Sequence, residues 1–312
     1  MLRIIIPVLL LISTVSALFT ASELEVVKNL CNDILDRKPV LIAGFVRLIF
    51  HDCVGGCDGC VNLNLENWNG DRPNAGLATS ISVLNGKYVE LQQTVNISRA
   101  DFWATCSVEA LERARFLATN DMSKSLNISM LYGRADCILE LTTTNADRFP
   151  NPRAGLAETL AWCNNTFNFN STWCVAILGA HTLGQARPSA SGFRGRWVAD
   201  ARHLNNAYFQ DLRDKRWLQV NRKTVADPRW QFQARGQSMF MMLNADMCLL
   251  RDIQPDSAGR VVDPLDATPE SSTKDDVETF ADDNEEWIRV FKAAFKSIIE
   301  TLPDGAAPLE SI

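Results

Sequence analysis

Apolar residues recur at helical spacing along most of the chain. The clearest segment is 282–302, where apolar residues from Trp287 to Ile299 fall at i, i+3, i+4, i+7 and i+8. Acidic residues crowd the first turn of this segment, where the helix dipole favours anions, and Pro303 ends it. We predict further helices at 23–36, 40–53, 99–119, 155–164, 173–184 and 205–214. Because strand-type alternation is scarce and no internal repeat is found, we expect an all-α protein.

A proline-rich segment divides the chain into two halves of similar size. The sequence Phe149-Pro150-Asn151-Pro152 cannot be helical. We therefore expect two helical lobes, 18–150 and 151–302, followed by a tail at 303–312, with the last helix either in the second lobe or packed back on the first. A chain of 312 residues with 46% hydrophobic residues is long enough to bury such a core.

The N-terminal segment has the pattern of a signal peptide at 1–17. Arg3 precedes an apolar run from Ile4 to Ile12, and small residues end at Ala17. An uncleaved anchor is the alternative. The run is short for a membrane span and no later segment approaches eighteen apolar residues, so we expect a soluble mature chain without stable membrane association. We expect a secreted, extracellular glycoprotein, or one in the lumen of the secretory pathway, with sequons at Asn96, Asn127, Asn164 and Asn170.

Nine cysteines are expected to be mostly paired in a secreted chain, and the odd number leaves at least one free. From proximity in the sequence we predict the disulfides Cys53–Cys57 and Cys163–Cys174. Spacing does not give the partners of the other five: Cys31, Cys60, Cys106, Cys137 and Cys248.

The charge balance excludes one class of partner. The net charge of −6 and the sequence pI of about 5.2 leave no basic face for neutralising phosphates, so we expect no nucleic-acid partner. Residues 252–286 hold 12 acidic residues against only Arg260 and Lys274. This stretch is either a solvated loop or a docking face for a cationic partner.

The segment Arg47-Leu-Ile-Phe50-His51-Asp52-Cys53 carries the first candidate chemistry. On a helix Arg47 and His51 stand at i and i+4, so a fixed cation and a titratable base project from one face beside Phe50. Two readings remain open from spacing alone. The pair forms a catalytic site, or His51 is a core histidine ion-paired to Asp52 with Arg47 on the surface.

A second histidine ends the apolar segment Trp173 to Gly184. At this position His181 is either a satisfied core residue or an axial ligand to a buried metal or haem. The chain has only three histidines, and His203 is the third.

These two segments resemble the haem peroxidases of the plant, fungal and bacterial superfamily. R-L-I-F-H-D-C looks like the distal motif, L-G-A-H-T-L-G looks like the proximal motif, and their order agrees with the family. The resemblance runs from about Glu23 to Leu302 and includes four further blocks in family order: 73–77, 100–102, 133–136 and 241–246. It implies a two-lobed helical fold with haem b between a distal and a proximal lobe.

The resemblance is a hybrid of two branches. The distal side and the cysteines from Cys53 to Cys60 look like the secreted branches, whereas N-A-G-L, S-G-F-R-G-R-W and M-M-L-x-x-D look like the branch containing cytochrome c peroxidase and ascorbate peroxidase. Ala190 occupies the place of the arginine that ascorbate peroxidases use. The reducing substrate is therefore not inherited from either branch.

On the distal side the resemblance assigns three catalytic residues. His51 would take a proton from hydrogen peroxide and return it to the leaving oxygen. Arg47 would stabilise the charge that develops as the O–O bond breaks. Asn74 would accept the His51 N–H and so keep Nε2 free to act as base.

On the proximal side the resemblance places His181 on the haem iron. Asp246 would accept a hydrogen bond from the other ring nitrogen, which strengthens the ligand. Trp197 matches a tryptophan that can lie against the imidazole and hold a radical, and Phe50 would line the haem. Taken alone, Asp246 reads as a helix cap and Trp197 as a packing residue.

Two cation sites of the secreted branches are matched in part. Asp52, Gly56 and Asp58 fit a distal calcium pattern, but Cys60 stands where that pattern has a serine. Thr182 and Asp200 fit a proximal site, but Asn205 replaces an aspartate and Val198 supplies only a carbonyl. We expect calcium or no ion at the distal site, and calcium, a monovalent ion or none at the proximal site.

The resemblance implies a secreted, monomeric haem peroxidase that responds to oxidative stress by reducing hydrogen peroxide with a small, phenolic or similar donor. Two other classes are weighed against it. A non-catalytic haem-binding or extracellular-matrix protein would be expected to lack at least one of Arg47, His51, Asn74, His181 and Asp246, and all are present. A zinc module on Cys53, Cys57, Cys60 and His51 has poor tetrahedral spacing.

Overall fold

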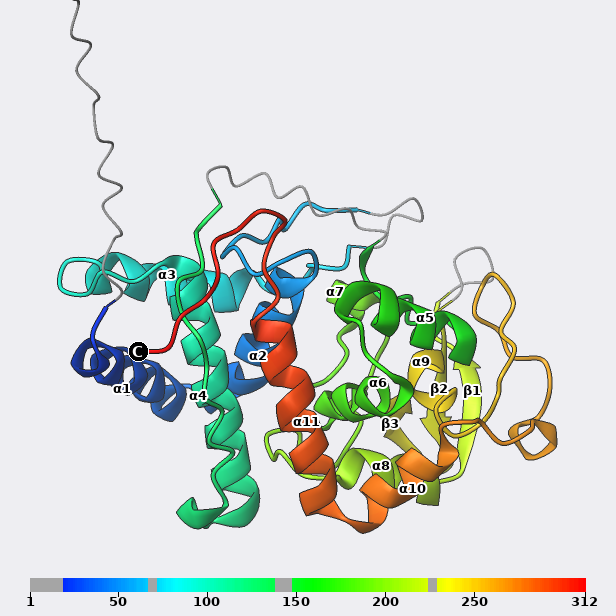
Figure 1. The fold of residues 1–312 in the computed structure, drawn as a ribbon. Helices are drawn as coiled ribbons and strands as arrows, with labels where there is room; N and C mark the ends of the chain where they lie inside the picture. Colours follow the sequence, from blue (N-terminus) through cyan, green and yellow to red (C-terminus); the bar gives the residue numbers. More distant parts are fainter. Residues whose placement is uncertain (1–18, 67–71, 138–147, 224–228) are drawn as a thin grey trace, which may run out of the picture.

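The computed structural model describes residues 19–66, 72–137, 148–223 and 229–312 and is mainly helical (Figure 1). The predicted signal peptide lies outside these residues. The first half contains α1 (Ala21–Arg37), α2 (Ile42–Cys53), α3 (Ala78–Leu91) and α4 (Arg99–Thr119). The second half contains α5 (Leu156–Phe167), α6 (Ser171–Leu178), α7 (Pro188–Ser191), α8 (Ala207–Asp214), α9 (Asn244–Met247), α10 (Lys274–Asp282) and α11 (Asn284–Ile299). The helical fold class is confirmed.

A small antiparallel sheet was not expected from the sequence. Strands β1 (Trp217–Asn221), β2 (Trp230–Ala234) and β3 (Gln237–Met242) pair in the order β1-β2-β3. The first half of β3 is exposed and the second half is buried. The alternation of period two that identifies a half-buried strand is therefore missing from its sequence.

The longest predicted helices form where expected because their ends are capped. α4 begins after Ser98, whose hydroxyl accepts the Asp101 N–H at 3.0 Å, and it ends at Asn120 in the left-handed conformation. α11 begins two residues later than predicted. Asp283 caps it by accepting the N–H groups of Glu285 and Glu286, while Asp282 belongs to the end of α10.

The helix that leads to His181 is shorter than predicted. α6 ends at Leu178 and a 3-10 turn, Gly179–Thr182, follows it. At Gly179 an added Cβ would lie 2.6 Å from Nε1 of Trp287 in α11. Trp287 also donates to the Ala176 carbonyl at 3.0 Å. The close approach of α11 therefore requires glycine here, and it fixes the turn that carries His181.

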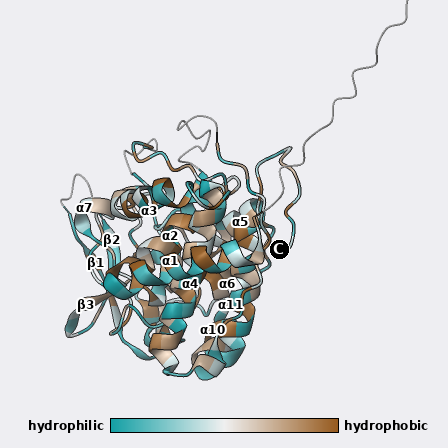
Figure 2. Ribbon diagram, turned by 90° about the vertical axis from the view of Figure 1, so that its left-hand side faces the viewer, coloured by the Kyte–Doolittle hydropathy of each residue, from teal (hydrophilic) through white to brown (hydrophobic). Residues whose placement is uncertain are grey.

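α11 lies in the middle of the molecule and contacts both α2 and α6 (Figure 1). Its apolar face is buried, as the pattern predicted, from Trp287 to Ile299. Figure 2 shows hydrophobic and hydrophilic residues alternating along the helices, as expected when each buries one face. The last helix thus packs on helices of both halves, while its assignment to a lobe and the division into lobes stay predictions.

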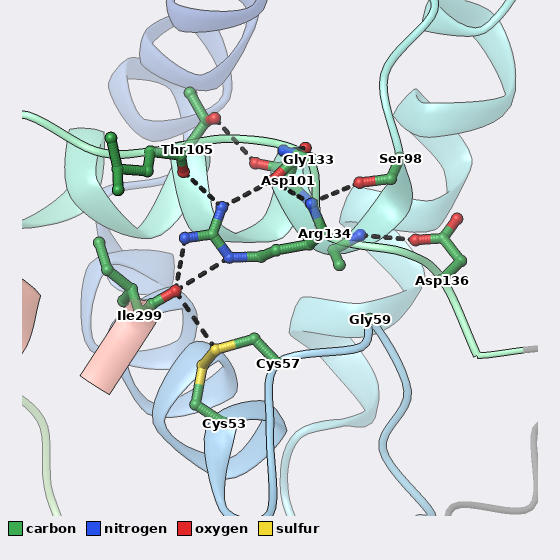
Figure 3. Close-up of polar contacts among 12 residues, drawn as sticks. Cys53, Cys57, Gly59, Ser98, Asp101, Thr105, Gly133, Arg134, Asp136 and Ile299 are labelled. Carbon is green, nitrogen blue, oxygen red and sulfur yellow. Dashed lines mark hydrogen bonds and ion pairs between the residues drawn. A yellow bond between two sulfur atoms is a disulfide. The ribbon is translucent and has the colours of Figure 1, made fainter. Parts of the chain in front are cut away.

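A buried ion pair attaches the end of α11 to the first half of the chain. Arg134 lies between the Asp101 carboxylate and the Ile299 carbonyl (Figure 3). Its Nη1 is 2.6 Å from Asp101 Oδ1, and its Nε donates to the Ile299 carbonyl at 2.9 Å. Both charged side chains are almost fully buried.

Both predicted disulfides, Cys53–Cys57 and Cys163–Cys174, are confirmed. Two more, Cys31–Cys106 and Cys60–Cys137, complete the pairing, and Cys248 is a buried free thiol. The asparagines of all four sequons are exposed, and their glycosylation stays a prediction. Among the described helices, none has both the length and the apolar content needed to cross a bilayer.

Candidate active site

The side chain of Asn74 determines which nitrogen of His51 carries the proton. Asn74 Nδ2 donates to the Asn62 carbonyl at 2.8 Å, so its Oδ1 faces His51 Nδ1, also at 2.8 Å. Because an amide oxygen only accepts, Nδ1 is the protonated nitrogen. The lone pair is therefore on Nε2, the tautomer required of a base. The expected contact between His51 and Asn74 is confirmed.

Aromatic rings enclose His51 and lower its basicity. Phe149 stacks on the imidazole with ring centroids 4.8 Å apart, and Phe50 meets it edge-on at 5.5 Å. Burial holds the pKa of His51 well below its usual value, and the positive charge of Arg47 lowers it further. His51 is therefore a neutral imidazole at neutral pH. Phe149, at the expected lobe boundary, carries no motif from which its contact with this ring could be predicted.

Carbonyl groups of the segment 73–75 hold Arg47. Its Nη2 donates to the Pro73 carbonyl at 2.6 Å and its Nη1 donates to the Ala75 carbonyl at 3.0 Å. Burial lowers the pKa of Arg47 to about 10, so the guanidinium keeps its charge at neutral pH. One short segment thus fixes Arg47 directly and His51 through Asn74. The alternative with Arg47 on the surface and His51 paired to Asp52 is wrong.

The proximal histidine has its Nδ1 engaged as well. Nδ1 of His181 lies 2.7 Å from Oδ1 of Asp246, which leaves Nε2 as the nitrogen available to a metal. Asp246 is fully buried, whereas the His181 side chain keeps 31% of its surface exposed. The expected contact between these residues, 65 positions apart, is confirmed.

Four donors converge on the Asp246 carboxylate. Besides His181, these are Trp197 Nε1 at 2.7 Å, the Tyr208 hydroxyl at 2.8 Å and the Leu243 N–H at 2.6 Å. Burial alone would raise the pKa of Asp246, but its interaction with His181 and the other hydrogen bonds outweigh burial, so its pKa is lowered. Asp246 is therefore an ionised carboxylate, and its role exceeds that of a helix cap.

Trp197 and Tyr208 surround the proximal imidazole. The Trp197 indole stacks on His181 with centroids 4.2 Å apart, and the Tyr208 ring meets it edge-on at 6.0 Å. Trp197 was expected here from the resemblance, whereas Tyr208 was not. Burial and the Asp246 charge hold the pKa of Tyr208 well above its usual value, so its hydroxyl stays protonated.

The two histidine sites are chemically suited to a haem. Each imidazole has Nδ1 in a hydrogen bond, and no described residue bonds either Nε2. A buried carboxylate supports the imidazole of His181 but not that of His51, as an iron ligand requires. The segments that carry them also meet, since an added Cβ at Gly184 would lie 2.9 Å from the Cβ of Ala43 in α2. These residues would place one imidazole on the iron and the other at the peroxide.

The expected distal cation residues are engaged within the protein. Asp52 accepts the N–H groups of Gly59 at 3.1 Å and Cys60 at 2.8 Å, and Asp58 also accepts the Cys60 N–H. Cys60 forms a disulfide with Cys137 and offers no thiolate. The same pairing, with Cys53–Cys57, removes every cysteine from the zinc alternative. Calcium at Asp52, Gly56 and Asp58 stays a prediction.

The expected proximal cation residues have protein partners too. The Thr182 hydroxyl donates to the His203 carbonyl at 3.3 Å. Asp200 Oδ2 lies 3.3 Å from Nε2 of His203, and Asp200 forms an ion pair with Arg202 at 3.8 Å. An ion at this site stays a prediction.

Known proteins resemble this chain across most of its length. The peroxidase family profile matches residues 26–258. A mitochondrial cytochrome c peroxidase of Cryptococcus neoformans is 29% identical over 65% of this chain and 45% of its own length. A protein of Gibberella zeae named "Putative heme-binding peroxidase" is 26% identical over 84% of this chain and 71% of its own length.

The relatives correct the expected location. The cytochrome c peroxidases of Cryptococcus neoformans and the similar protein of Yarrowia lipolytica are named as mitochondrial, which points to mitochondria rather than to secretion. The expectation of secretion rested on the apolar N-terminal pattern at 1–17 and on the sequons, and the names of the relatives overturn it. The chain spans about half the length of the Cryptococcus relative. The peroxidase family profile covers well over half of the present chain, and the chain therefore belongs to the peroxidase family.

Proposed function

We propose that this protein reduces hydrogen peroxide to water and oxidises a small donor in one-electron steps, with haem b bound at His181. The observation that carries the proposal is the matched pair of hydrogen bonds, His51 to Asn74 and His181 to Asp246, which leaves both Nε2 atoms free. When bound, the haem supplies the iron that reacts with peroxide and the oxidising equivalents passed to the donor.

His51 acts as general base and then as general acid. Its unprotonated Nε2 takes a proton from one oxygen of hydrogen peroxide and returns it to the other oxygen, so that water leaves. The lowered pKa of His51 keeps the base form available at neutral pH. Proton transfer by a positioned side chain is worth roughly 10²–10⁴-fold in rate.

Arg47 stabilises the negative charge that develops on the leaving oxygen. The Pro73 and Ala75 carbonyls fix two of its nitrogens, so the cation is oriented before the reaction begins. A preorganised charge in a site that excludes water costs no reorganisation as the O–O bond breaks. Asn74 helps to orient both residues. In the sequence it lies between Pro73 and Ala75, whose carbonyls hold Arg47, and its side chain fixes the His51 tautomer.

A cationic protein is a second candidate donor. The relatives named cytochrome c peroxidase favour it. So do acidic side chains on the α10–α11 surface, where Asp275 and Asp283 are exposed, while Asp282 and Glu285 there pair with Arg213 and Arg115. A phenol and reduced cytochrome c, offered to the same preparation, distinguish the two donor classes. A rate with cytochrome c that falls steeply with salt would favour the protein donor.

Stopped-flow mixing of the haem-loaded protein with peroxide tests the proposed reaction. His51→Ala should retain haem and react with peroxide at least 10²-fold more slowly. The matched control is His203→Ala. His203 is the third histidine of the chain, and its side chain contacts Asp200 in the second half. His203→Ala should react like the wild type. A His51→Ala protein that reacts at the wild-type rate would exclude His51 as the base.

A further inference from the structure

Tyr208 provides a contact that the proposed peroxide chemistry does not use. Its hydroxyl donates to Asp246 Oδ1 at 2.8 Å, and the same oxygen lies 2.7 Å from Nδ1 of His181. The other oxygen, Oδ2, accepts from Trp197 Nε1 and the Leu243 N–H. All four acceptor positions of this carboxylate are therefore filled, and Tyr208 shares a single oxygen with His181.

We propose that Tyr208 is a positioning residue that limits how much negative charge Asp246 passes to His181, and thereby sets the reduction potential of the iron. The inference rests on the proposed ligation of haem by His181. A carboxylate that accepts the N–H of an axial imidazole makes that ligand a stronger electron donor and so stabilises ferric iron. A second donor on the same oxygen weakens this transfer.

The surroundings strengthen both hydrogen bonds to this oxygen. Asp246 and Tyr208 are both completely buried, so water does not replace either hydrogen bond. Hydrogen bonds to an ionised group are stronger than neutral ones, and a low local dielectric strengthens them further. The effect of one phenol hydroxyl should therefore be measurable at the metal.

The position of Tyr208 is fixed from several sides. It lies in the first turn of α8, after Asn206, whose side chain donates to the Phe280 and Ala281 carbonyls of α10 at 2.9 Å. Its ring packs edge-on against Phe209 at 4.9 Å and against His181 at 6.0 Å. This packing orients the ring so that its hydroxyl donates to Asp246.

Tyr208→Phe removes the hydroxyl and keeps the ring. Asp246 Oδ1 would then accept from His181 alone, and the imidazole would gain anionic character. We expect the ferrous-to-ferric equilibrium to shift about tenfold toward ferric iron, a midpoint potential about 59 mV more negative. The iron–imidazole stretching frequency of the ferrous protein should rise, because the bond becomes stronger.

Tyr88→Phe is the matched control. Tyr88 is also buried and also donates to a carboxylate, Asp136 at 3.3 Å, but it lies in α3 with no contact to His181 or Asp246. Its loss should leave the potential and the stretching frequency at the wild-type values. A potential and frequency in Tyr208→Phe equal to those of the wild type would overturn the proposal.

A second measurement keeps the hydroxyl in place, in case Tyr208→Phe fails to bind haem. Only three tyrosines exist in the chain, and replacement of all three by difluorotyrosine makes each phenol a stronger donor. The potential should then become more positive, and an unchanged potential would contradict the proposal. Both measurements use protein that has not met peroxide. A lack of peroxide turnover would therefore count against the proposed function and not against the role of Tyr208.

Discussion

The indole of Trp197 lies against the imidazole of His181, with ring centroids 4.2 Å apart and planes inclined by 19°. The same indole donates to Asp246 at 2.7 Å, so the carboxylate bridges the two rings. An oxidisable ring is thus held in van der Waals contact with the proposed iron ligand. A packing tryptophan would not need its Nε1 on the same buried carboxylate as the histidine.

Replacing this ring should change where an oxidising equivalent resides. In Trp197→Phe we expect the first reaction with peroxide to keep its rate, while the radical signal that follows, measured by electron paramagnetic resonance, changes or is lost. Trp173→Phe in α6 is the control, because that indole packs on Phe169 away from His181. Identical signals from wild type and Trp197→Phe would show that the radical forms on another residue.

The reaction with peroxide should depend on pH in a direction set by His51. Because burial, and next the charge of Arg47, hold its pKa well below 6.5, the base form persists from neutral into acidic solution. The rate should stay level below pH 6.5 and fall only as the pH passes through the lowered pKa. Stopped-flow rates across this range measure the midpoint.

Removal of the neighbouring cation supplies the control for this profile. Arg47→Leu deletes the charge that lowers the pKa of His51, so the midpoint should move to higher pH even though the rate itself drops. A wild-type rate that falls near pH 6.5 would contradict the lowered pKa of His51. A midpoint that does not move in Arg47→Leu would contradict the contribution of Arg47 to that pKa.

Neutralising the proximal carboxylate should act on the iron rather than on peroxide binding. In Asp246→Asn the imidazole loses its anionic partner, so we expect the ferric/ferrous potential to become more positive by a readily measured amount. Spectroelectrochemical titration gives the value. Asp36→Asn, in the ion pair with Arg113 in the first half of the chain, should leave it unchanged. A wild-type potential in Asp246→Asn would remove this residue from control of the iron.

The Asp101–Arg134 pair should be important for stability (Figure 3). Arg134→Met leaves a buried carboxylate without its cation and the Ile299 carbonyl without its donor, so we expect a loss of about 3–5 kcal/mol in the free energy of unfolding. The exposed pair Arg113–Asp36 is the comparison, and Arg113→Met should cost at most about 1 kcal/mol. Urea unfolding of the haem-loaded proteins measures both. Equal losses would show that burial adds nothing.

The sequence predicted the parts of the fold that have local causes. α11 was predicted from its apolar periodicity and the acidic residues of its first turn, and the structure adds the caps Ser98 for α4 and Asp283 for α11, which act within a few positions. The sheet was missed because its burial changes along β3 rather than alternating. The 3-10 turn at His181 depends on contact between Gly179 and Trp287, 108 positions away in the chain.

The same distinction applies to the candidate site. Arg47 and His51 were visible as an i, i+4 pair, and the resemblance added Asn74, His181, Trp197 and Asp246. Phe149 and Tyr208 carry no motif, and their contacts with His51 and Asp246 arise only when distant segments pack together. Of the tyrosines, Tyr208 could have been singled out only by its place in a predicted helix soon after Trp197.

Titration of the apoprotein with hemin, followed by absorbance, tests the central assignment most directly. The wild type should take up one equivalent and develop a Soret band with the spectrum of a single imidazole ligand. His181→Ala should lose that spectrum, and added free imidazole should restore it. His203→Ala should bind as the wild type does. A wild-type protein with no Soret band, or a spectrum that does not change in His181→Ala, would contradict the account.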